Sequence, residues 1–181
     1  MEKGMKRITV ASLLLLWLFV LLYQKLHIGW MLSCAITFGT CFYHFAMRLL
    51  IGEIYDKCMD NKADYSKKWY QLKKWEMSLY KKLKVKKWKR KMPTYKSEYF
   101  SPKKHTWDEI AQAMCQAELV HETIIIFSFV PVVFSILWDS FGVFFITSFF
   151  AALFDLSFVV MQRYNRPRVV KIAMKEKGNA K

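Results

Sequence analysis

The sequence lacks the short motifs that mark several common enzyme classes. It has no glycine-rich phosphate-binding loop and no G-x-S-x-G turn around a nucleophilic serine. The histidine boxes of membrane desaturases are absent, and one E-x-x-H motif cannot hold a di-iron centre, which uses two of them with further carboxylates. His105 and Asp108 also miss the four-residue separation that is typical of soluble-face glycerolipid acyltransferases. We therefore predict no metal, no bound cofactor and no covalent serine enzyme.

Acidic residues are scarce as well, with 14 Asp and Glu against 29 Lys and Arg in 181 residues and a formal charge of +15. Yet 54% of the residues are hydrophobic and 17% are aromatic. Because the apolar and basic residues fall in separate segments, the composition indicates a membrane protein and not a basic globular one. The cysteines form no C-x-x-C pair and are predicted to be reduced and structural: Cys34, Cys41, Cys58 and Cys115.

Apolar stretches at residues 8–23, 30–52, 123–138 and 141–161 approach the length of about 20 residues that a helix needs to cross a membrane. They predict an all-α integral membrane protein with about four transmembrane helices. The first stretch follows Lys3, Lys6 and Arg7 and could be a signal peptide, but no small-x-small cleavage site follows it, which favours a retained helix.

A strongly basic segment lies between the second and third stretches. Residues 61–104 carry sixteen basic residues against three acidic ones, which leaves +13 of the chain's +15 in this basic segment. Positively charged loops stay in the cytoplasm. The sequence therefore predicts a multi-pass protein of the cell membrane with both termini and the basic segment in the cytoplasm.

Aromatic and leucine residues recur at three- and four-residue steps among these lysines, which predicts a basic amphipathic helical segment at the membrane interface. Its lysines would contact anionic headgroups, with Trp69 and Trp88 at headgroup depth. A nucleic-acid partner is the alternative for such a mixture. A loop tethered between two membrane spans meets lipid first, so we predict membrane lipids and no nucleic acid as partners. After the segment, Thr106 and Glu109 predict a capping box at the start of the third helix.

The third and fourth stretches form a predicted antiparallel hairpin, with a tight polar break at residues 138–140. The two ends of the hairpin, at Glu118 and Arg168, should therefore meet in space. Asp155 lies about 10 Å inside the membrane from Gln162 at 1.5 Å per residue, and an unpaired carboxylate there is costly.

We expect Asp155 to pair with a cationic side chain of the second helix. His44 and Arg48 fall at a similar depth and are the candidate partners. Such a pair would serve either as structural glue between helices or as part of a site.

Three motifs in the second half of the chain carry a resemblance. Leu-Tyr-Lys at 79–81 is followed by Trp-Lys at 88–89 and Pro93. Gln-Ala-Glu-Leu-Val-His occupies 116–121, and Gln-Arg-Tyr-Asn-Arg-Pro-Arg occupies 162–168. From about residue 79 to 169 the chain resembles the glycosyl-diaponeurosporenoate acyltransferases. These membrane enzymes put a fatty acyl chain on the glucose of a glycosylated carotenoid acid.

Acyl transfer to a hydroxyl needs a base, donors for the developing oxyanion, and groups that hold the acyl donor. His121 is the candidate base. Glu118, three residues earlier, is the candidate carboxylate that orients its imidazole. The candidate substrate-binding residues are Gln162 and Asn165 for the carbonyl, Arg163, Arg166 and Arg168 for donor phosphates, and Asp155, His44 and Arg48, to which the resemblance adds Tyr164, Trp88 and Lys89.

The same residues also have plainer interpretations. A histidine and a glutamate at the interfacial end of a helix reach water and need no function. The arginines at 163–168 would equally suit an anchor for headgroups of the inner leaflet. The sequence further departs from the family pattern. Gln116 stands in place of the usual Arg, while Asp155 and Ser157 replace a frequent Asn and Pro. A different acceptor is therefore possible.

The sequence predicts four parts: an N-terminal transmembrane helix pair at 1–60, a basic cytoplasmic interfacial segment at 61–106, a membrane hairpin with acyltransferase-like motifs at 107–170, and a basic tail at 171–181. The predicted function is a membrane acyltransferase that esterifies a sugar hydroxyl of a glycolipid or glycosylated carotenoid. Its co-substrate would be acyl-CoA or another acyl donor, and its lipid-linked acceptor would arrive through the membrane. The alternative is a non-catalytic assembly protein of a lipid-modifying complex. The oligomeric state is left open.

Overall fold

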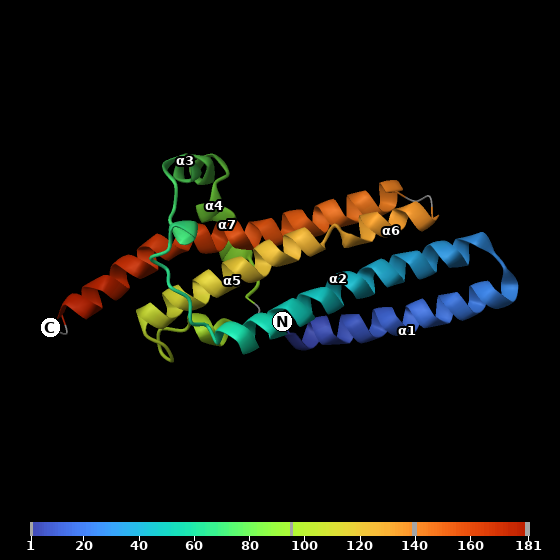
Figure 1. The fold of residues 1–181 in the computed structure, drawn as a ribbon, viewed down its shortest axis with the longest axis horizontal. Coiled ribbons are helices and arrows are strands. Elements are labelled where there is room, and N and C mark those ends of the chain that lie inside the picture. Colours follow the sequence, from blue (N-terminus) through green and yellow to red (C-terminus); the bar gives the residue numbers. More distant parts are fainter. Residues whose placement is uncertain (1, 95, 139–140, 180–181) are drawn as a thin grey trace.

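The computed structural model describes residues 2–94, 96–138 and 141–179, and two helical hairpins form its framework (Figure 1). The first hairpin consists of α1 (Glu2–Leu26) and α2 (Gly29–Met59). The second consists of α5 (Trp107–Phe127) and α6 (Val130–Trp138), which pack against α7 (Phe141–Asn179). The two hairpins meet chiefly where α2 packs on α5.

Four segments are long and apolar enough to cross a membrane, which confirms the predicted all-α membrane protein. These segments are Glu2–Leu26, Gly29–Met59, Trp107–Ile136 and Phe141–Gly178. Large apolar side chains point away from the bundle along all four, as expected where a helix faces lipid. Examples are Leu14, Trp17, Leu50, Ile126, Val133, Ile136, Phe150 and Leu153.

The third span is interrupted once, between α5 and α6. The Oγ of Ser128 donates to the carbonyl of Ile124 at 2.8 Å, and Pro131 occupies the second position of α6. Proline lacks an N–H group and is tolerated in the first turn of a helix, so α6 begins where a continuous helix would have lost a hydrogen bond. The predicted polar break before α7 lies partly at 139–140, outside the described residues.

The last helix continues well past the apolar run that predicted it. The run ends at Met161, but α7 reaches Asn179 and contains Pro167. Its 39 residues correspond to about 58 Å, roughly twice the thickness of the hydrocarbon core. α1 begins only about midway along α7, so the far halves of α5 and α7 extend beyond the start of α1 (Figure 1).

The basic segment surrounds this extension in short helical pieces. They are η1 (Lys68–Tyr70), α3 (Lys74–Lys82), α4 (Val85–Trp88), η2 (Lys89–Lys91) and η3 (Ser97–Phe100). Lys84 has a φ of 51°, in the left-handed region that a helix of L-residues does not continue through, and it separates α3 from α4. The predicted helical character is present, but in pieces and not as one long helix.

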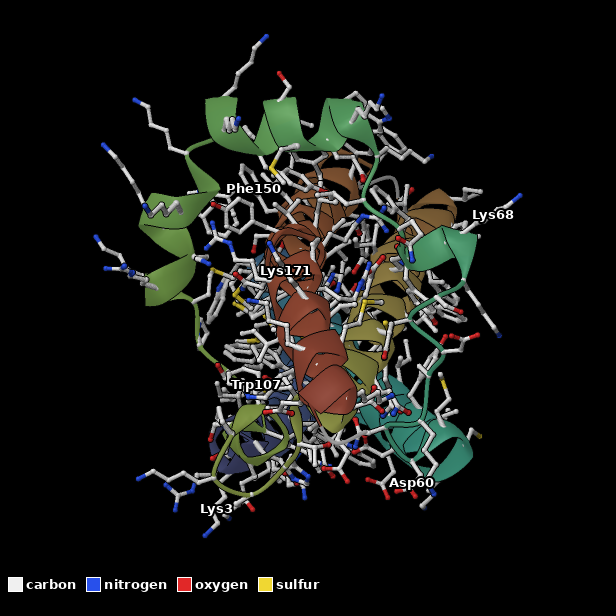
Figure 2. The ribbon with its side chains drawn as sticks, turned by 90° about the vertical axis from the view of Figure 1, so that its left-hand side faces the viewer. Lys3, Asp60, Lys68, Trp107, Phe150 and Lys171 are labelled. Atoms are coloured by element: carbon white, nitrogen blue, oxygen red, sulfur yellow. The ribbon has the colours of Figure 1, made fainter. Side chains whose placement is uncertain are left out.

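Seen end-on, the basic segment partly encircles α7, with Lys171 near the centre and Lys68 on one side (Figure 2). Tyr70, Tyr80 and Val85 are buried toward the helices, while the lysines of α3 and α4 point outward. The predicted capping box is present. Thr106 accepts from the amide of Glu109 at 3.2 Å, and the Glu109 carboxylate accepts from the Thr106 amide at 2.8 Å. This cap fixes where α5 begins.

Candidate active site

Three helices bring His121, Asp155 and Arg48 together. The Nδ1 atom of His121 on α5 lies 2.8 Å from Oδ1 of Asp155 on α7. The other carboxylate oxygen of Asp155 pairs with the guanidinium of Arg48 on α2. The prediction that Asp155 pairs with a cation of the second helix is therefore confirmed, with Arg48 as the partner. Asp155 is only 1% exposed, so both contacts hold its carboxylate out of the lipid.

The carboxylate of Asp155 fixes the orientation of the His121 ring. A hydrogen bond at Nδ1 leaves Nε2 available to accept a proton, the arrangement of a histidine base oriented by a carboxylate. The ring also stacks on Phe158 with centroids 4.5 Å apart and planes only 5° apart. The His121 side chain keeps 20% of its surface accessible, so a substrate can reach it.

His121 faces a cavity of about 140 Å³ between α2, α5, α7 and the end of the basic segment. One wall is apolar and includes Val120, Ile124 and Phe154. Met5, near the start of α1, also lines the cavity, which places it at the level where the first span begins. The cavity therefore lies at the end of the bundle where the first span begins.

Another part of the cavity lining is polar, and we call it the polar wall. Asp56 on α2 accepts from Nε2 of Gln116 at 2.9 Å and pairs with Lys96 of the basic segment. The side-chain oxygen of Gln116 accepts from the backbone amide of Asn61 at 2.8 Å. Gln162 also lines the cavity, from α7. This wall offers a carboxylate, a cation and amides to a polar group that stands before His121.

Glu118 does not orient His121, and this part of the predicted site is wrong. Its fully buried carboxylate pairs with Arg163 and Arg166 of α7. Glu118 and His121 are one turn apart on α5, but the carboxylate that reaches His121 comes from Asp155 on α7. The predicted base thus has a carboxylate partner, supplied by another helix.

Arg163 has no donor left for a substrate phosphate. Its guanidinium donates to both carboxylate oxygens of Glu76, to Glu118, and to the backbone carbonyls of Trp69 and Gln71. These hydrogen bonds use all five N–H donors of an arginine. The predicted role of Arg163 in holding the acyl donor is therefore not supported, because it fastens the basic segment to α7.

Arg166 is engaged in the same way. It pairs with Glu118, donates to the carbonyl of Tyr70, and lies over the Tyr70 ring at 5.2 Å. Burial raises the pKa of Tyr70 to about 12, so its ring stays neutral beside the cation. We call Glu118, Arg163, Arg166 and Glu76 the buried ion cluster. It closes one side of the bundle and leaves no charge free for chemistry.

The remaining predicted residues lie outside the cavity lining, on α7 and on the basic segment beside it. Lys89 donates to Asn165, and its Nζ lies 4.7 Å from the centre of the Tyr164 ring. Arg168 lies over the same ring at 5.4 Å. Trp88 donates its indole N–H to the carbonyl of Leu83 at 3.1 Å and so belongs to the packing of the basic segment.

His44 is buried on α2, and neither of its ring nitrogens has a hydrogen-bond partner among the described residues. Arg48, one turn further, donates to the carbonyl of His44 at 2.7 Å and takes Asp155 as its partner. His44 thus supports Arg48 through its carbonyl, while its ring takes no part in the hydrogen bonds of the site. Across residues 2–94, 96–138 and 141–179 we find no group of three or more His, Cys, Asp or Glu side chains that could bind a metal.

Asp56 and Lys96 of the cavity and Glu76 of the buried ion cluster were not predicted as site residues. Arg48, Gly52 and Asp56 follow one another at four-residue steps and all line the cavity. That spacing puts them on one face of α2 and was the available signal. Glu76 gave no such signal, because its partner Arg163 is 87 residues away.

These elements define the chain as an all-α, multi-span membrane protein with a polar site where α2, α5 and α7 meet. Residues 66–175, more than half of the chain, match the family model of glycosyl-4,4'-diaponeurosporenoate acyltransferase, and the chain belongs to this family. The family name denotes an acyltransferase. No curated protein and no solved structure matches the chain.

Proposed function

We propose that the protein is a membrane acyltransferase that esterifies a sugar hydroxyl of a glycolipid or a glycosylated carotenoid with a fatty acyl chain. The observation that carries this proposal is the His121–Asp155 pair, which opens on a cavity with one apolar and one polar wall. A lipid-linked sugar suits such a cavity, because its tail stays in the bilayer while its hydroxyls stand at the interface. The family match supports the reaction class.

In the proposed reaction Nε2 of His121 removes the proton from the acceptor hydroxyl. The hydroxyl oxygen attacks the acyl carbonyl, a new ester C–O bond forms, and the bond from the acyl carbon to its leaving group breaks. The proton then passes from His121 to the leaving group. Asp155 stabilises the imidazolium that exists between these steps. Arg48 pairs with the Asp155 carboxylate and holds it in place.

The carbonyl oxygen gains negative charge during this attack and needs a hydrogen-bond donor. Gln162 is the donor that the geometry favours, since its side chain lines the cavity. Asn165 was predicted to share this role, but its side-chain oxygen accepts from Lys89 and it does not line the cavity. The proposal therefore keeps Gln162 and omits Asn165.

The polar wall supplies the contacts for the acceptor sugar. A carboxylate accepts from hydroxyls while amide and ammonium groups donate to them, and Asp56, Gln116 and Lys96 provide all three kinds of group. The acyl donor, acyl-CoA or another activated acyl group, would enter from the end that carries the basic segment. The reaction as proposed requires no bound cofactor.

The proposed orientation puts both termini and the basic segment on the cytoplasmic side of the cell membrane. It follows from the positive charge of that segment. Cys58 is exposed at the end of α2 and gives a test. With the other three cysteines replaced by serine, an impermeant maleimide should label Cys58 only after cells are opened. Labelling of intact cells would reverse the orientation.

The outward lysines of the basic segment are proposed to contact anionic headgroups (Figure 2). Spin-labelled phosphatidylglycerol in vesicles with the full chain should show immobilised lipid that decreases at high salt, because surface charge interactions are screened. The absence of any salt effect would contradict this contact.

The test of the proposed function compares lipids from cells that express the wild-type chain, His121→Ala or His105→Ala. His105 lies in the basic segment near Glu109 and serves as the matched control. By mass spectrometry the wild type and His105→Ala should yield a glycolipid heavier by one acyl chain, and His121→Ala should not. If His121→Ala inserts in the membrane and still yields the product, the protein acts as a non-catalytic assembly protein.

A further inference from the structure

Half-buried and buried cations of this end of the molecule are almost all paired with carboxylates. Arg48 has Asp155, Lys96 has Asp56, and Arg163 and Arg166 share the carboxylates of the buried ion cluster. Lys89 differs, because it is half-buried and forms no ion pair with any described carboxylate. The side-chain partner of Lys89 is the neutral amide oxygen of Asn165, so its charge can still be compensated by an anionic ligand.

The surroundings of Lys89 strengthen this point. The charged groups that act on Lys89 are Arg168, Arg90 and Lys86, all of them cations. Burial lowers the pKa of Lys89, and these three neighbours lower it further. Like charges gathered at one place repel one another unless an anion lies among them. Tyr164 and Asn165 hold the group in place, through ring contacts to Lys89 and Arg168 and a hydrogen bond to Lys89.

The cation group is connected directly to the cavity. After Lys89 the chain runs back along α7, where Ser157 contacts the sulfur of Met92 at 3.9 Å, and then lines the cavity from Pro93 onward. Phe158, which stacks on His121, precedes Asn165 by seven residues, or about 10 Å along the helix. A molecule with its reacting carbonyl at His121 can thus place an anionic group at Lys89 only if a spacer lies between them.

We infer that Lys89 and Arg168, arranged around Tyr164, form a phosphate-binding site that holds the diphosphate of an acyl-CoA donor. This assignment rests on the proposed function. In acyl-CoA the pantetheine arm separates the thioester from the diphosphate and is long enough to span the separation along α7. In a phospholipid the ester carbonyl and the phosphate are close neighbours and would not reach both places. The site replaces the predicted role of Arg163 and Arg166, whose charges are already compensated.

The experiment measures binding of coenzyme A to the full chain in nanodiscs of neutral phosphatidylcholine. The double variant Lys89→Gln/Arg168→Gln is compared with Lys171→Gln/Lys175→Gln, which removes the same charge from exposed positions of α7. The first variant should bind coenzyme A at least about tenfold more weakly and the second less than about twofold, because charge-assisted hydrogen bonds are lost only in the first. Inorganic pyrophosphate should compete with coenzyme A. Arg168→Lys, which keeps the charge, should retain most of the affinity.

Several results would overturn the inference. One is an equal loss of affinity in both double variants, which would mean that only net charge matters. Another is unchanged binding in a correctly folded Lys89→Gln/Arg168→Gln protein. In nanodiscs with phosphatidylglycerol, displacement of coenzyme A by the lipid at the wild-type site would assign the site to a headgroup and not to the donor. His121→Ala should bind coenzyme A normally, so failure of the proposed catalysis remains distinguishable from failure of this site.

Discussion

Two groups of charged side chains lie within a few turns of each other on α5 and α7, and they differ in what they face. His121, Asp155 and Arg48 open on the cavity, and the His121 side chain stays partly accessible. The buried ion cluster has all its charges matched internally and holds the basic segment on α7. The first arrangement keeps part of its histidine open to the cavity, whereas in the second Arg163 has no N–H donor left. Accessibility, and not charge alone, marks the group that is able to react.

Glu118→Ala should produce the largest effect on stability. It leaves Arg163 and Arg166 buried beside an empty space, and breaking such a buried pair costs about 3–5 kcal/mol. Thermal unfolding in detergent measures the loss. Glu122→Ala on the same helix is the control, since Glu122 accepts only an indole N–H from Trp69, at 3.0 Å. Equal loss in both variants would show that the cluster is not special.

Asp155→Asn should lower turnover by about 10² to 10³ per folded molecule, because an amide cannot hold the imidazole in the productive tautomer or stabilise its charge. The readout is the rate of acylated lipid formation, normalised to the amount of correctly folded protein. The double variant with His121→Ala should be no slower than His121→Ala alone, because the two residues act as one unit. If the losses of turnover in the two single variants add up in the double variant, Asp155 does not act through His121.

Arg163→Lys should cost about 2 kcal/mol of stability, because an ammonium group has three donors and cannot reproduce the planar fork that contacts Glu76 and two carbonyls. The control is Arg7→Lys, at an exposed position of α1. Proteolysis within the basic segment should also become faster in Arg163→Lys. A variant as stable and as resistant as wild type would refute the fastening role.

The smallest effect is expected at a surface pair. Glu98 and Lys104 lie 3.1 Å apart, but both are largely exposed, so Glu98→Gln should change stability by less than about 0.5 kcal/mol. Glu76→Gln makes the same chemical change within the buried ion cluster and should cost several times more. Similar unfolding temperatures for the two variants would contradict the difference proposed between the buried ion cluster and exposed ion pairs.

The spans, the basic segment and the ion pair at Asp155 were all accessible to sequence reasoning. Hydropathy and length alone identify the four spans. A carboxylate at the position of Asp155 predicts a cationic partner, because an unpaired carboxylate is costly in hydrocarbon. Arg48 lies at the matching depth. The start of α5 at Thr106 also follows from local hydrogen-bonding rules.

The partner of Glu118 was not accessible in this way. Its spacing to His121 is the spacing of neighbours on one helix, and nothing local shows that Arg163 and Arg166 approach Glu118 from α7. Glu118 pairs with these arginines of α7 and not with His121, its neighbour on α5. The length of α7 was missed for a related reason. From the local sequence alone, Pro167 and the arginines indicate that the helix ends near them. In the structure the basic segment covers their polar face and the helix continues.

The unbroken path of α7 has a mechanical consequence. Asp155 and Arg166 are carried by one rod, eleven residues apart, so their separation along it stays near 16 Å whatever the bilayer does. A thicker or thinner membrane is accommodated by tilting a helix, not by stretching it. The depth of Asp155 in the membrane is therefore fixed relative to the end of α7 that the basic segment holds. Lipid composition should alter how readily substrates reach His121 while the spacing of the residues along α7 is preserved.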